Sequence, residues 1–382
     1  MQPVCLLIDR IDKADDNAEF LYRWLRKNHP EVQIYFGLEK NAPDWFRLVN
    51  DNFNLIDLDN IKQYRNILKT VTHLLVSNPV KKNKNIAPNA IRIFLQHGIT
   101  NRRAKASADY INDCADWADY IVATSEAEKA LLTTSLYHAK KNQVYVTGFP
   151  RHDSLCERKN KSTKKYICFQ PHWAMYLTDP DKQLLSSEYF KGWKTLLQSE
   201  QLRQYYKQTG NRLAFRLHPC SYKYEQEWLK ILPPYIIYVD RYESFQKTFT
   251  EALVYVSDYS SNMFEVGIID TPCIYYRPDA DYIRNHTEAG DFEKGILGVI
   301  GPATYTVDQF MTALKDYTNN KFRPDLKYKT TRDHLFPYKL DTHNCERVYT
   351  WLILETLGHT PKHKQIKKDI RADGQSNAYL YF

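Results

Sequence analysis

The chain has 382 residues, of which 43% are hydrophobic and 26% are charged, a composition typical of a globular protein. This length exceeds one ordinary hydrophobic core, so we expect two domains. The net charge of +8 favours anionic partners such as nucleotides, polyanions or an acidic membrane face, without selecting one of them. No run of about 18 apolar residues is present, which excludes a membrane-spanning helix.

The N-terminus and the cysteines point to one compartment. The first residues reach acidic side chains too early for a signal peptide. Seven cysteines form no CxxC pair, and Cys5, Cys168 and Cys273 lie in predicted strands, where a reduced thiol packs as a small apolar group. We therefore expect the reducing cytoplasm.

The first half of the chain alternates short apolar segments with amphipathic ones. The segment Asp15-Asp16-Asn17 supplies an N-cap for a helix after the first strand. This alternation is typical of a parallel sheet with helices wound on both sides. The predicted strands are 4–8, 32–36, 73–76, 91–95, 120–123 and 144–146.

The second half repeats this rhythm after a polar, basic linker at 157–165. A closing helix is predicted at 350–357, with Gly358 as its C-cap. The predicted strands are 166–169, 213–217, 235–239, 253–256 and 273–276. The predicted domains are 1–156, 166–345, a crossover helix at 346–358 and a basic tail at 359–382.

One stretch, Leu253 to Tyr276, is typical of an anion site. A buried strand runs into hydroxyl groups and then into a helix, so free amides, the helix dipole and the hydroxyls of Ser260 and Ser261 would meet at one place. The alternative is that Ser260 or Asp258 only caps the helix. Glu265, one turn further on, is placed to accept a hydrogen bond from a ribose hydroxyl, or else is a surface carboxylate.

Two histidines stand where predicted strands end, His97 before Gly98 and His218 before Pro219. The carboxyl ends of parallel strands face the ligand crevice, and a histidine pKa near neutrality suits proton transfer or phosphate binding. Across a cleft between two α/β halves, the two histidines would converge on one ligand. The alternative is that both are hydrogen-bonded bystanders.

Several basic residues accompany these histidines. The segment Arg151-His152-Asp153 either contacts a ligand directly or holds an Arg–Asp pair that stabilises a tight turn. Arg216, two residues before His218, either pairs with phosphate or is a surface charge. Arg102 and Arg103 either meet an anionic acceptor or form a solvated turn.

Taken in order, these strand-end motifs resemble the CDP-glycerol glycerophosphotransferase family, the enzymes of wall teichoic acid and of related capsule and surface polysaccharides. The resemblance covers roughly residues 4 to 355. The segments Asp15 to Glu19 and Gly290-Asp291-Phe292 with Gly298 look like the same subgroup. The five motifs are Gln96-His97-Gly98, Thr147 to Asp153, Pro171-His172-Trp173, His218-Pro219 and Ser257 to Ser261.

The resemblance implies an α/β fold of GT-B type, with two Rossmann-like domains facing each other across a cleft and a C-terminal helix crossing back. It implies transfer of a polyol phosphate, with glycerol phosphate first, from a CDP-activated donor to a hydroxyl of a saccharide or growing surface polymer, with release of CMP. CDP-glycerol is then the donor substrate, and no metal, other cofactor or nucleic acid is required.

The resemblance also implies residue roles. His97 matches the general base, His218 matches the histidine on the donor pyrophosphate, and Ser260 and Ser261 match the hydroxyls beside it. Ile99-Thr100, His172 and Arg216 depart from the usual Thr-Pro, threonine and lysine of teichoic acid members. The remaining donor-side residues are Pro171, His172, Arg216, Asp258 and Glu265, and the acceptor-side residues are Gly98, Arg102, Arg103, Arg151, His152 and Asp153.

Two other functions remain open at this point. A glycosyltransferase of the same fold would move a sugar from a nucleotide donor in capsule or surface polysaccharide synthesis, attacking the anomeric carbon instead of phosphorus. A non-catalytic polyanion-binding module would keep the basic surface without needing His97 or His218. For the transferase we expect a cytoplasmic location with peripheral contact to the inner membrane face, to which the basic tail and the positive charge contribute.

Overall fold

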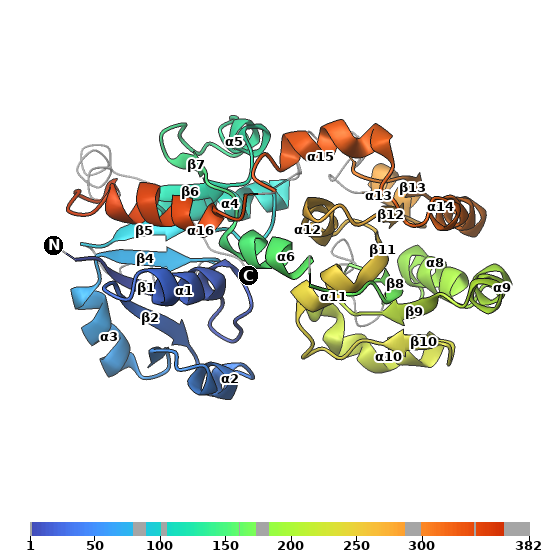
Figure 1. Ribbon diagram of the computed structural model, residues 1–382, viewed down its shortest axis with the longest axis horizontal. Helices are drawn as coiled ribbons and strands as arrows, with labels where there is room; N and C mark the ends of the chain where they lie inside the picture. The colour runs from blue at the N-terminus through green and yellow to red at the C-terminus, as the bar shows by residue number, and fades with distance from the viewer. Residues whose placement is uncertain are drawn as a thin grey trace. The chain divides into compact units, whose positions relative to one another are not determined.

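The computed structural model describes residues 2–78, 89–100, 105–159, 161–172, 183–286, 299–339 and 341–362, without the side chains of 105–107 and 286. The chain forms two compact units (Figure 1). Unit 1 holds Met1–Thr100, Lys105–Ser154 and Leu335–Phe382, and unit 2 runs from Leu155 to His334. Each unit contains one parallel sheet and is described by itself.

Among the described residues, the sheet of unit 1 has seven parallel strands in the order β3-β2-β1-β4-β5-β6-β7. The order reverses between β1 and β4, where Cys5 pairs with His73, and ligands of such sheets bind at this switch point beyond the carboxyl ends of the strands. The strands are β1 (Val4–Ile8), β2 (Gln33–Leu38), β3 (Leu55–Asp57), β4 (His73–Val76), β5 (Ile91–Phe94), β6 (Tyr120–Ala123) and β7 (Val144–Val146).

Helices connect these strands, and the last segment of the chain returns to the same unit. They are α1 (Asn17–Asn28), α2 (Trp45–Asn50), α3 (Ile61–Thr70), α4 (Lys105–Trp117), α5 (Glu126–Leu132), α6 (Pro150–Lys159), which leads into unit 2, and α16 (Asn344–Arg347), which continues as a π-helix over Val348–Leu354.

In the part of unit 2 that the structure describes, the sheet has six parallel strands in the order β10-β9-β8-β11-β12-β13, which is again a doubly wound order. Its switch point lies between β8 and β11, where Phe169 pairs with Val256. The strands are β8 (Tyr166–Phe169), β9 (Arg212–Phe215), β10 (Ile236–Tyr238), β11 (Ala252–Ser257), β12 (Cys273–Tyr276) and β13 (Ala303–Thr304).

The helices of unit 2 include two short 3-10 segments, Pro219–Tyr224 and Leu326–Tyr328. The α-helices are α8 (Glu188–Leu197), α9 (Glu200–Thr209), α10 (Glu225–Ile231), α11 (Phe245–Glu251), α12 (Asn262–Ile268), α13 (Ala280–His286), α14 (Val307–Asn319) and α15 (Lys329–Leu335). No helix in the described part of the chain is long and apolar enough to cross a bilayer.

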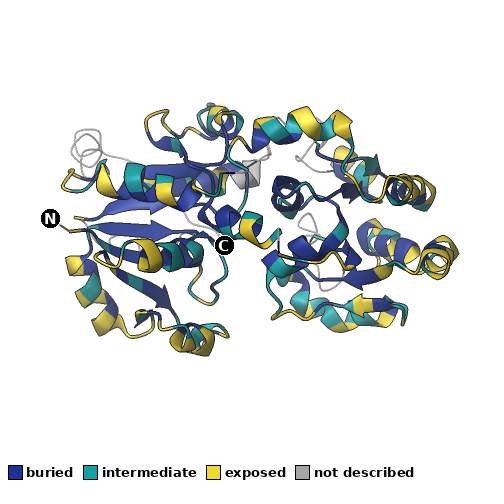
Figure 2. Ribbon diagram, in the orientation of Figure 1, coloured by how far each residue is buried: buried dark blue, intermediate teal, exposed yellow. Residues whose placement is uncertain are grey.

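Each sheet lies in the core of its unit, and Figure 2 shows the central strands buried while the outer helices carry the exposed residues. Strands covered on both faces are apolar throughout, as in Cys5 to Ile8 and Val254 to Val256. Aromatic packing adds to this, with Trp193 and Trp228 fully buried in unit 2. Because these strands are buried on both faces, they form continuous apolar runs that can be recognised as strands in the sequence.

Two expected segments differ in the structure. The linker predicted at 157–165 overlaps the last turn of α6, which extends to Lys159. The closing helix begins at Asn344 and not at 350, because the Asp153 carboxylate accepts hydrogen bonds from the Asn344 and Cys345 amides at 3.0 and 2.8 Å and so starts the helix there. Gly358 has a left-handed φ of +86°, but the π-helical turns end at Leu354.

His73 in β4 makes the stability of unit 1 depend on pH. Its ring is fully buried, and its Nε2 lies 3.0 Å from Thr356 Oγ1. Burial lowers the pKa of His73 to about 4, whereas the unfolded chain has a pKa near 6.5. The unfolded state therefore binds more protons below pH 6.5, and stability falls as the pH falls.

We expect His73 to contribute a loss of about 2 kcal/mol between pH 7 and pH 5. Urea titrations of wild type and His73→Asn at both pH values measure this loss as the difference in their pH dependence. Equal pH dependence in the two proteins would contradict the expectation.

Candidate active site

The N-terminal turn of α1 is built on Asp9, the residue directly after β1. The buried Asp9 carboxylate accepts from the amides of Asp16, Ala18 and Glu19 at 3.0, 2.8 and 3.2 Å, and from Ser77 Oγ at 2.6 Å. Burial, with the nearby Asp16 charge, raises the pKa of Asp9. Asp9 therefore joins the first amides of α1 to the end of β4 at the switch point.

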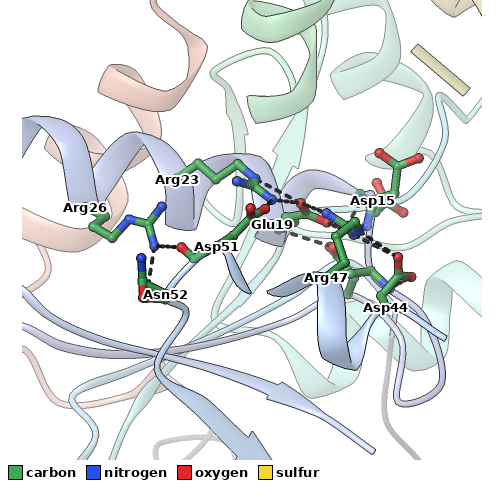
Figure 3. A network of polar contacts seen from close by, with 11 residues as sticks. Asp15, Glu19, Arg23, Arg26, Asp44, Arg47, Asp51 and Asn52 are labelled. Carbon is green, nitrogen blue, oxygen red and sulfur yellow. Dashed lines mark hydrogen bonds and ion pairs between the residues drawn. The ribbon is translucent and has the colours of Figure 1, made fainter. Parts of the chain in front are cut away.

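A second carboxylate, Glu19, braces the same turn from inside α1 (Figure 3). It accepts from Arg47 Nη1 and Arg23 Nη2, each at 2.7 Å, and from the Asp15 amide at 2.8 Å. Burial alone would raise the pKa of Glu19, but hydrogen bonds and charges from Arg47 and Arg23 hold it below its ordinary value. The network fixes the turn at Asp15, whose φ is +76°.

Asn17 connects the N-terminal turn of α1 to two other elements by hydrogen bonds. Its Nδ2 donates to the carbonyls of Leu95 and Gln96 at 3.1 and 2.7 Å, and its Oδ1 accepts from the Arg151 amide at 3.2 Å. Arg151 Nη1 also lies 2.5 Å from Asp16 Oδ1. One buried amide thus ties α1, the end of β5 and the start of α6 together, and it fixes the backbone just before His97.

Glu128 also holds the segment around this strand end. Its buried carboxylate accepts from the Thr100 amide at 2.8 Å, from the Thr124 amide at 2.7 Å and from Gln96 Nε2 at 3.3 Å. The capping-box spacing at Ser125 is half realised, because Ser125 Oγ accepts from the Glu128 amide while the Glu128 side chain turns to the 96–100 loop. Burial raises the pKa of Glu128.

His97 follows Gln96, whose φ is +58°, and its side chain is exposed. Nδ1 lies 3.3 Å from the Tyr110 hydroxyl. Desolvation by the surrounding protein lowers the pKa of His97 to about 4, and the charges of Arg151 and Arg10 lower it further. The ring is therefore neutral at physiological pH, the state that a general base needs.

Residues 151–153 form the first turn of α6. Arg151 pairs with Asp16, and Asp153 starts α16. His152 is buried, with its ring centroid 5.1 Å from that of Phe149. Gly98 is half-buried beside His97, and Arg102 and Arg103 lie outside the described residues.

In unit 2, His172 and His218 come together at the ends of β8 and β9, with ring centroids 4.6 Å apart. His218 Nδ1 accepts from the Cys220 amide at 3.2 Å, so Nε2 carries the ring proton of the neutral tautomer and is a donor. The His172 carbonyl accepts from the Tyr189 hydroxyl, and Pro171 before it is buried. Both histidines are half-buried.

Asp258 positions this pair from the end of β11. Its buried carboxylate accepts from the His172 amide at 3.1 Å, from the Tyr259 amide at 2.5 Å and from Trp193 Nε1 at 3.2 Å. Burial raises the pKa of Asp258 to about 7, partly offset by the Tyr259 amide. Asp258 thus organises the His172 backbone, a different role from the helix cap considered as its alternative.

The free amides expected after Ser260 are absent from the first three positions of α12. The Asn262 amide donates to Ser260 Oγ at 3.2 Å, and the Met263 and Phe264 amides donate to the carbonyls of Ser260 and Ser261 at 3.3 and 2.9 Å. Ser260 is buried and Ser261 is half-buried. The expectation of open amides here is wrong, because a local turn uses them first.

Arg216 and Glu265 are both buried, so neither is the surface charge considered as its alternative. Arg216 Nη1 donates to the Ser244 carbonyl at 3.2 Å, Nη2 donates to the Glu243 carbonyl at 2.6 Å, and the guanidinium carbon lies 3.8 Å from the Phe245 ring centroid. Arg216 therefore braces the turn before α11.

Replacing Arg216 with methionine is expected to lower the free energy of unfolding by about 2 kcal/mol, because the half-buried carbonyls of Glu243 and Ser244 lose a charged donor. Urea unfolding measures the loss. Arg212→Met, on the exposed start of the same strand, is the matched control and should change stability little. A loss in Arg212→Met equal to that in Arg216→Met would contradict the bracing role.

Known proteins resemble this chain in both sequence and fold. The family model for CDP-Glycerol:Poly(glycerophosphate) glycerophosphotransferase matches residues 1–354. The chain belongs to this family. The match extends over both sheets and reaches the last π-helical turn.

Two relatives come from Bacillus subtilis (strain 168). The minor teichoic acid biosynthesis protein GgaB is 26% identical over 375 residues, covering 92% of this chain and 40% of GgaB. The teichoic acid poly(glycerol phosphate) polymerase is 22% identical over 345 residues, covering 81% of this chain and 43% of the polymerase. The chain therefore spans less than half the length of either relative.

Solved structures establish the fold of this family member. The wall teichoic acid polymerase TagF matches with a TM-score of 0.66 at 16% identity, covering 97% of this chain and 90% of that chain. The S. aureus MnaA–UDP co-structure matches with a TM-score of 0.57 at 15% identity, covering 94% and 99%. The fold is thus α/β of GT-B type, with a doubly wound parallel sheet in each unit.

Sequence reasoning missed the residues that position His97. Asp9 directly follows the first predicted strand, and Glu128 occupies the last place of the capping-box motif, so position in the chain carried some signal for both. For Asn17 the sequence indicates only a role in a helix cap. Its contacts with Gln96 and Arg151 join residues far apart in sequence, and a single chain gives no local sign of them.

Proposed function

We propose that the protein transfers glycerol phosphate from CDP-glycerol to a hydroxyl of a saccharide or growing surface polymer and releases CMP. Membership of the family supports this donor and reaction. The observation that carries the proposal is His97, an exposed imidazole of lowered pKa at the end of β5. Its preceding backbone is fixed by Asn17 and the loop around it by Glu128.

In the proposed reaction His97 Nε2 takes the proton of the acceptor hydroxyl. The acceptor oxygen then bonds to the phosphorus of the glycerol phosphate group, and the bond from that phosphorus to the CMP oxygen breaks. Phosphoryl transfer depends mainly on positioning and on donors placed over the phosphoryl oxygens. His97 performs the proton transfer as general base.

The donor-side residues of the proposal are His218 and His172, with Ser260 and Ser261 after β11. Nε2 of His218 is an N–H donor of the kind that stabilises a pyrophosphate oxygen. His172 stands 4.6 Å away, and its backbone is held by Asp258, so it adds a second imidazole to the same strand ends. Arg216 is left out of the direct contacts because carbonyls of the 243–244 turn occupy its guanidinium.

Release of CMP from CDP-glycerol tests the proposal. The purified protein is incubated with CDP-glycerol, alone and with saccharide or glycerol-phosphate oligomers as acceptors, and CMP and extended acceptor are quantified by chromatography. Equal amounts of CMP and of glycerol phosphate joined to the acceptor are the expected result. Turnover of a nucleotide sugar, with no CMP from any CDP-polyol, would replace the proposal by the glycosyltransferase.

We propose that the enzyme works at the cytoplasmic face of the cell membrane, where the net positive charge and the basic tail would favour an anionic surface. The tail predicted to assist this placement lies outside the described residues beyond Lys362. Fractionation of cells that express the full chain tests the location. Recovery of the protein entirely apart from membranes, at low salt, would contradict peripheral binding.

A further inference from the structure

The side chains of His97, Tyr110 and Asn78 form a row of contacts that begins at His97 Nδ1. The hydroxyl of Tyr110 in α4 lies 3.3 Å from His97 Nδ1 and 3.2 Å from Oδ1 of Asn78, which follows β4. The rings of Tyr110 and His97 meet edge to face, with centroids 5.7 Å apart and an angle of 79°. The Tyr110 ring also packs against Phe94.

The protons of this chain of contacts can be assigned from donor and acceptor chemistry. The Tyr110 hydroxyl has one proton, and the Asn78 carbonyl oxygen only accepts. The Cys114 thiol in the same helix also hydrogen-bonds the Tyr110 hydroxyl. Because a thiol sulfur is a weaker acceptor than a carbonyl oxygen, the hydroxyl proton points to Asn78, and the hydroxyl oxygen accepts from His97 Nδ1. A neutral imidazole carries one N–H, so Nε2 keeps its lone pair.

Asn78 is itself held at the switch point of the sheet. Its amide donates to the Asp9 carbonyl at 3.1 Å, and the adjacent Ser77 donates its hydroxyl to the Asp9 carboxylate. The acceptor that orients the Tyr110 hydroxyl is thus anchored to the residue that organises the start of α1. The charged groups that act electrostatically on His97 and Tyr110 are Arg10, Arg151 and Asp16.

We infer that Tyr110 and Asn78 are positioning residues that hold His97 in the tautomer with a proton on Nδ1, so that Nε2 is the base. The inference rests on the proposed role of His97. To that role the inference adds the identity of the basic nitrogen. The order of contacts from His97 through Tyr110 to Asn78 decides which ring nitrogen accepts the substrate proton.

Because the contacts run from His97 through Tyr110 to Asn78, we can predict which variant loses more activity. In Tyr110→Phe, Nδ1 loses its acceptor and the two tautomers mix, so kcat/KM for CMP release should fall about tenfold with KM little changed. In Asn78→Leu, the hydroxyl proton turns to His97 Nδ1 and drives the ring proton to Nε2. Asn78→Leu should therefore be the more impaired variant, and the double variant should recover to the level of Tyr110→Phe.

The tautomer is read directly from nitrogen chemical shifts of ¹⁵N-histidine-labelled full chain, with His97→Ala identifying the His97 signals. We expect Nδ1 protonated in wild type, a mixture in Tyr110→Phe, Nε2 protonated in Asn78→Leu, and retention of the wild-type tautomer in Asn78→Asp, which keeps an acceptor. Tyr145→Phe, whose ring packs on Tyr120 in β6, is the control and should change neither tautomer nor rate.

An Nε2-protonated ring in wild type, or equal rates and tautomers in Asn78→Leu and wild type, would overturn the inference. The spectra need no substrate, so they are independent of the proposed function. If the spectra agree while CDP-glycerol yields no CMP, the proposed reaction fails and the tautomer assignment stands. If CMP release depends on His97 but the tautomer does not depend on Tyr110 or Asn78, only the inference fails.

Discussion

His97→Ala is expected to lower kcat/KM for CMP release from CDP-glycerol about a thousandfold, within the range that loss of a general base produces. The substitution removes an exposed side chain at the end of β5 and leaves the contacts of Asn17 with the Leu95 and Gln96 carbonyls in place. Stability should therefore change little, and initial rates of CMP release at low CDP-glycerol measure the loss.

The pH dependence of kcat/KM in the wild-type protein is a second test of His97 as the general base. The pKa of His97 is lowered by the surrounding protein and by Arg151 and Arg10, so the neutral base persists below the ordinary histidine range. The acid limb of kcat/KM should therefore lie below pH 6, because the base is lost only when its ring is protonated. A limb at pH 7 or above would contradict the assignment.

A matched control separates the base from a general effect of removing histidine. His359 is exposed in the same unit, and His359→Ala should keep the wild-type rate and pH profile. If His97→Ala keeps more than a third of wild-type kcat/KM under conditions where His359→Ala is fully active, His97 is not the base.

Glu128→Gln is expected to lower the free energy of unfolding by roughly 3 kcal/mol, the largest stability effect that we predict. The buried carboxylate accepts from the Thr100 and Thr124 amides, and the glutamine amide group would place a donor against a donor. One of these amides is then left without its acceptor. The 96–100 loop should loosen, so activity should fall together with stability.

Urea unfolding and amide hydrogen exchange measure the two effects of Glu128→Gln. Exchange at the Thr100 amide should accelerate, because that amide lies on the loop of His97. Glu126→Gln changes an exposed carboxylate two residues away in α5 and should leave both measurements unchanged. Unaltered exchange at Thr100 in Glu128→Gln would show that the carboxylate does not hold this loop.

The sequence by itself determined the alternation of strands and helices. Six strands were predicted at their observed bounds, namely 4–8, 73–76, 120–123, 144–146, 166–169 and 273–276. Buried parallel strands are continuous apolar runs, so local composition is enough to find them. β3 (Leu55–Asp57) and β13 (Ala303–Thr304) were missed because two or three residues at the sheet edges give too short a pattern.

The sequence also placed His97, His172 and His218 at strand ends, since a strand ends where its apolar run ends. It did not determine what each polar residue contacts. Arg216 stands near His218 in the chain, yet its guanidinium turns inward to the carbonyls before α11. Successive side chains of a strand point to opposite faces of the sheet, so the sequence indicates on which face a side chain lies. The turn that a long side chain then contacts belongs to another part of the chain, which the local sequence does not identify.

Only the tertiary structure decided how His97 is held. Asn17, Glu128 and Tyr110 contact the 96–100 loop from three different segments, and Asn78 contacts Tyr110 from a fourth. Their residue types are ordinary helix caps and loop residues, and burial beside a particular carbonyl or hydroxyl gives each its role. Local sequence fixes secondary structure through short-range apolar patterns, whereas hydrogen bonds between distant segments depend on the strand order that brings those segments together.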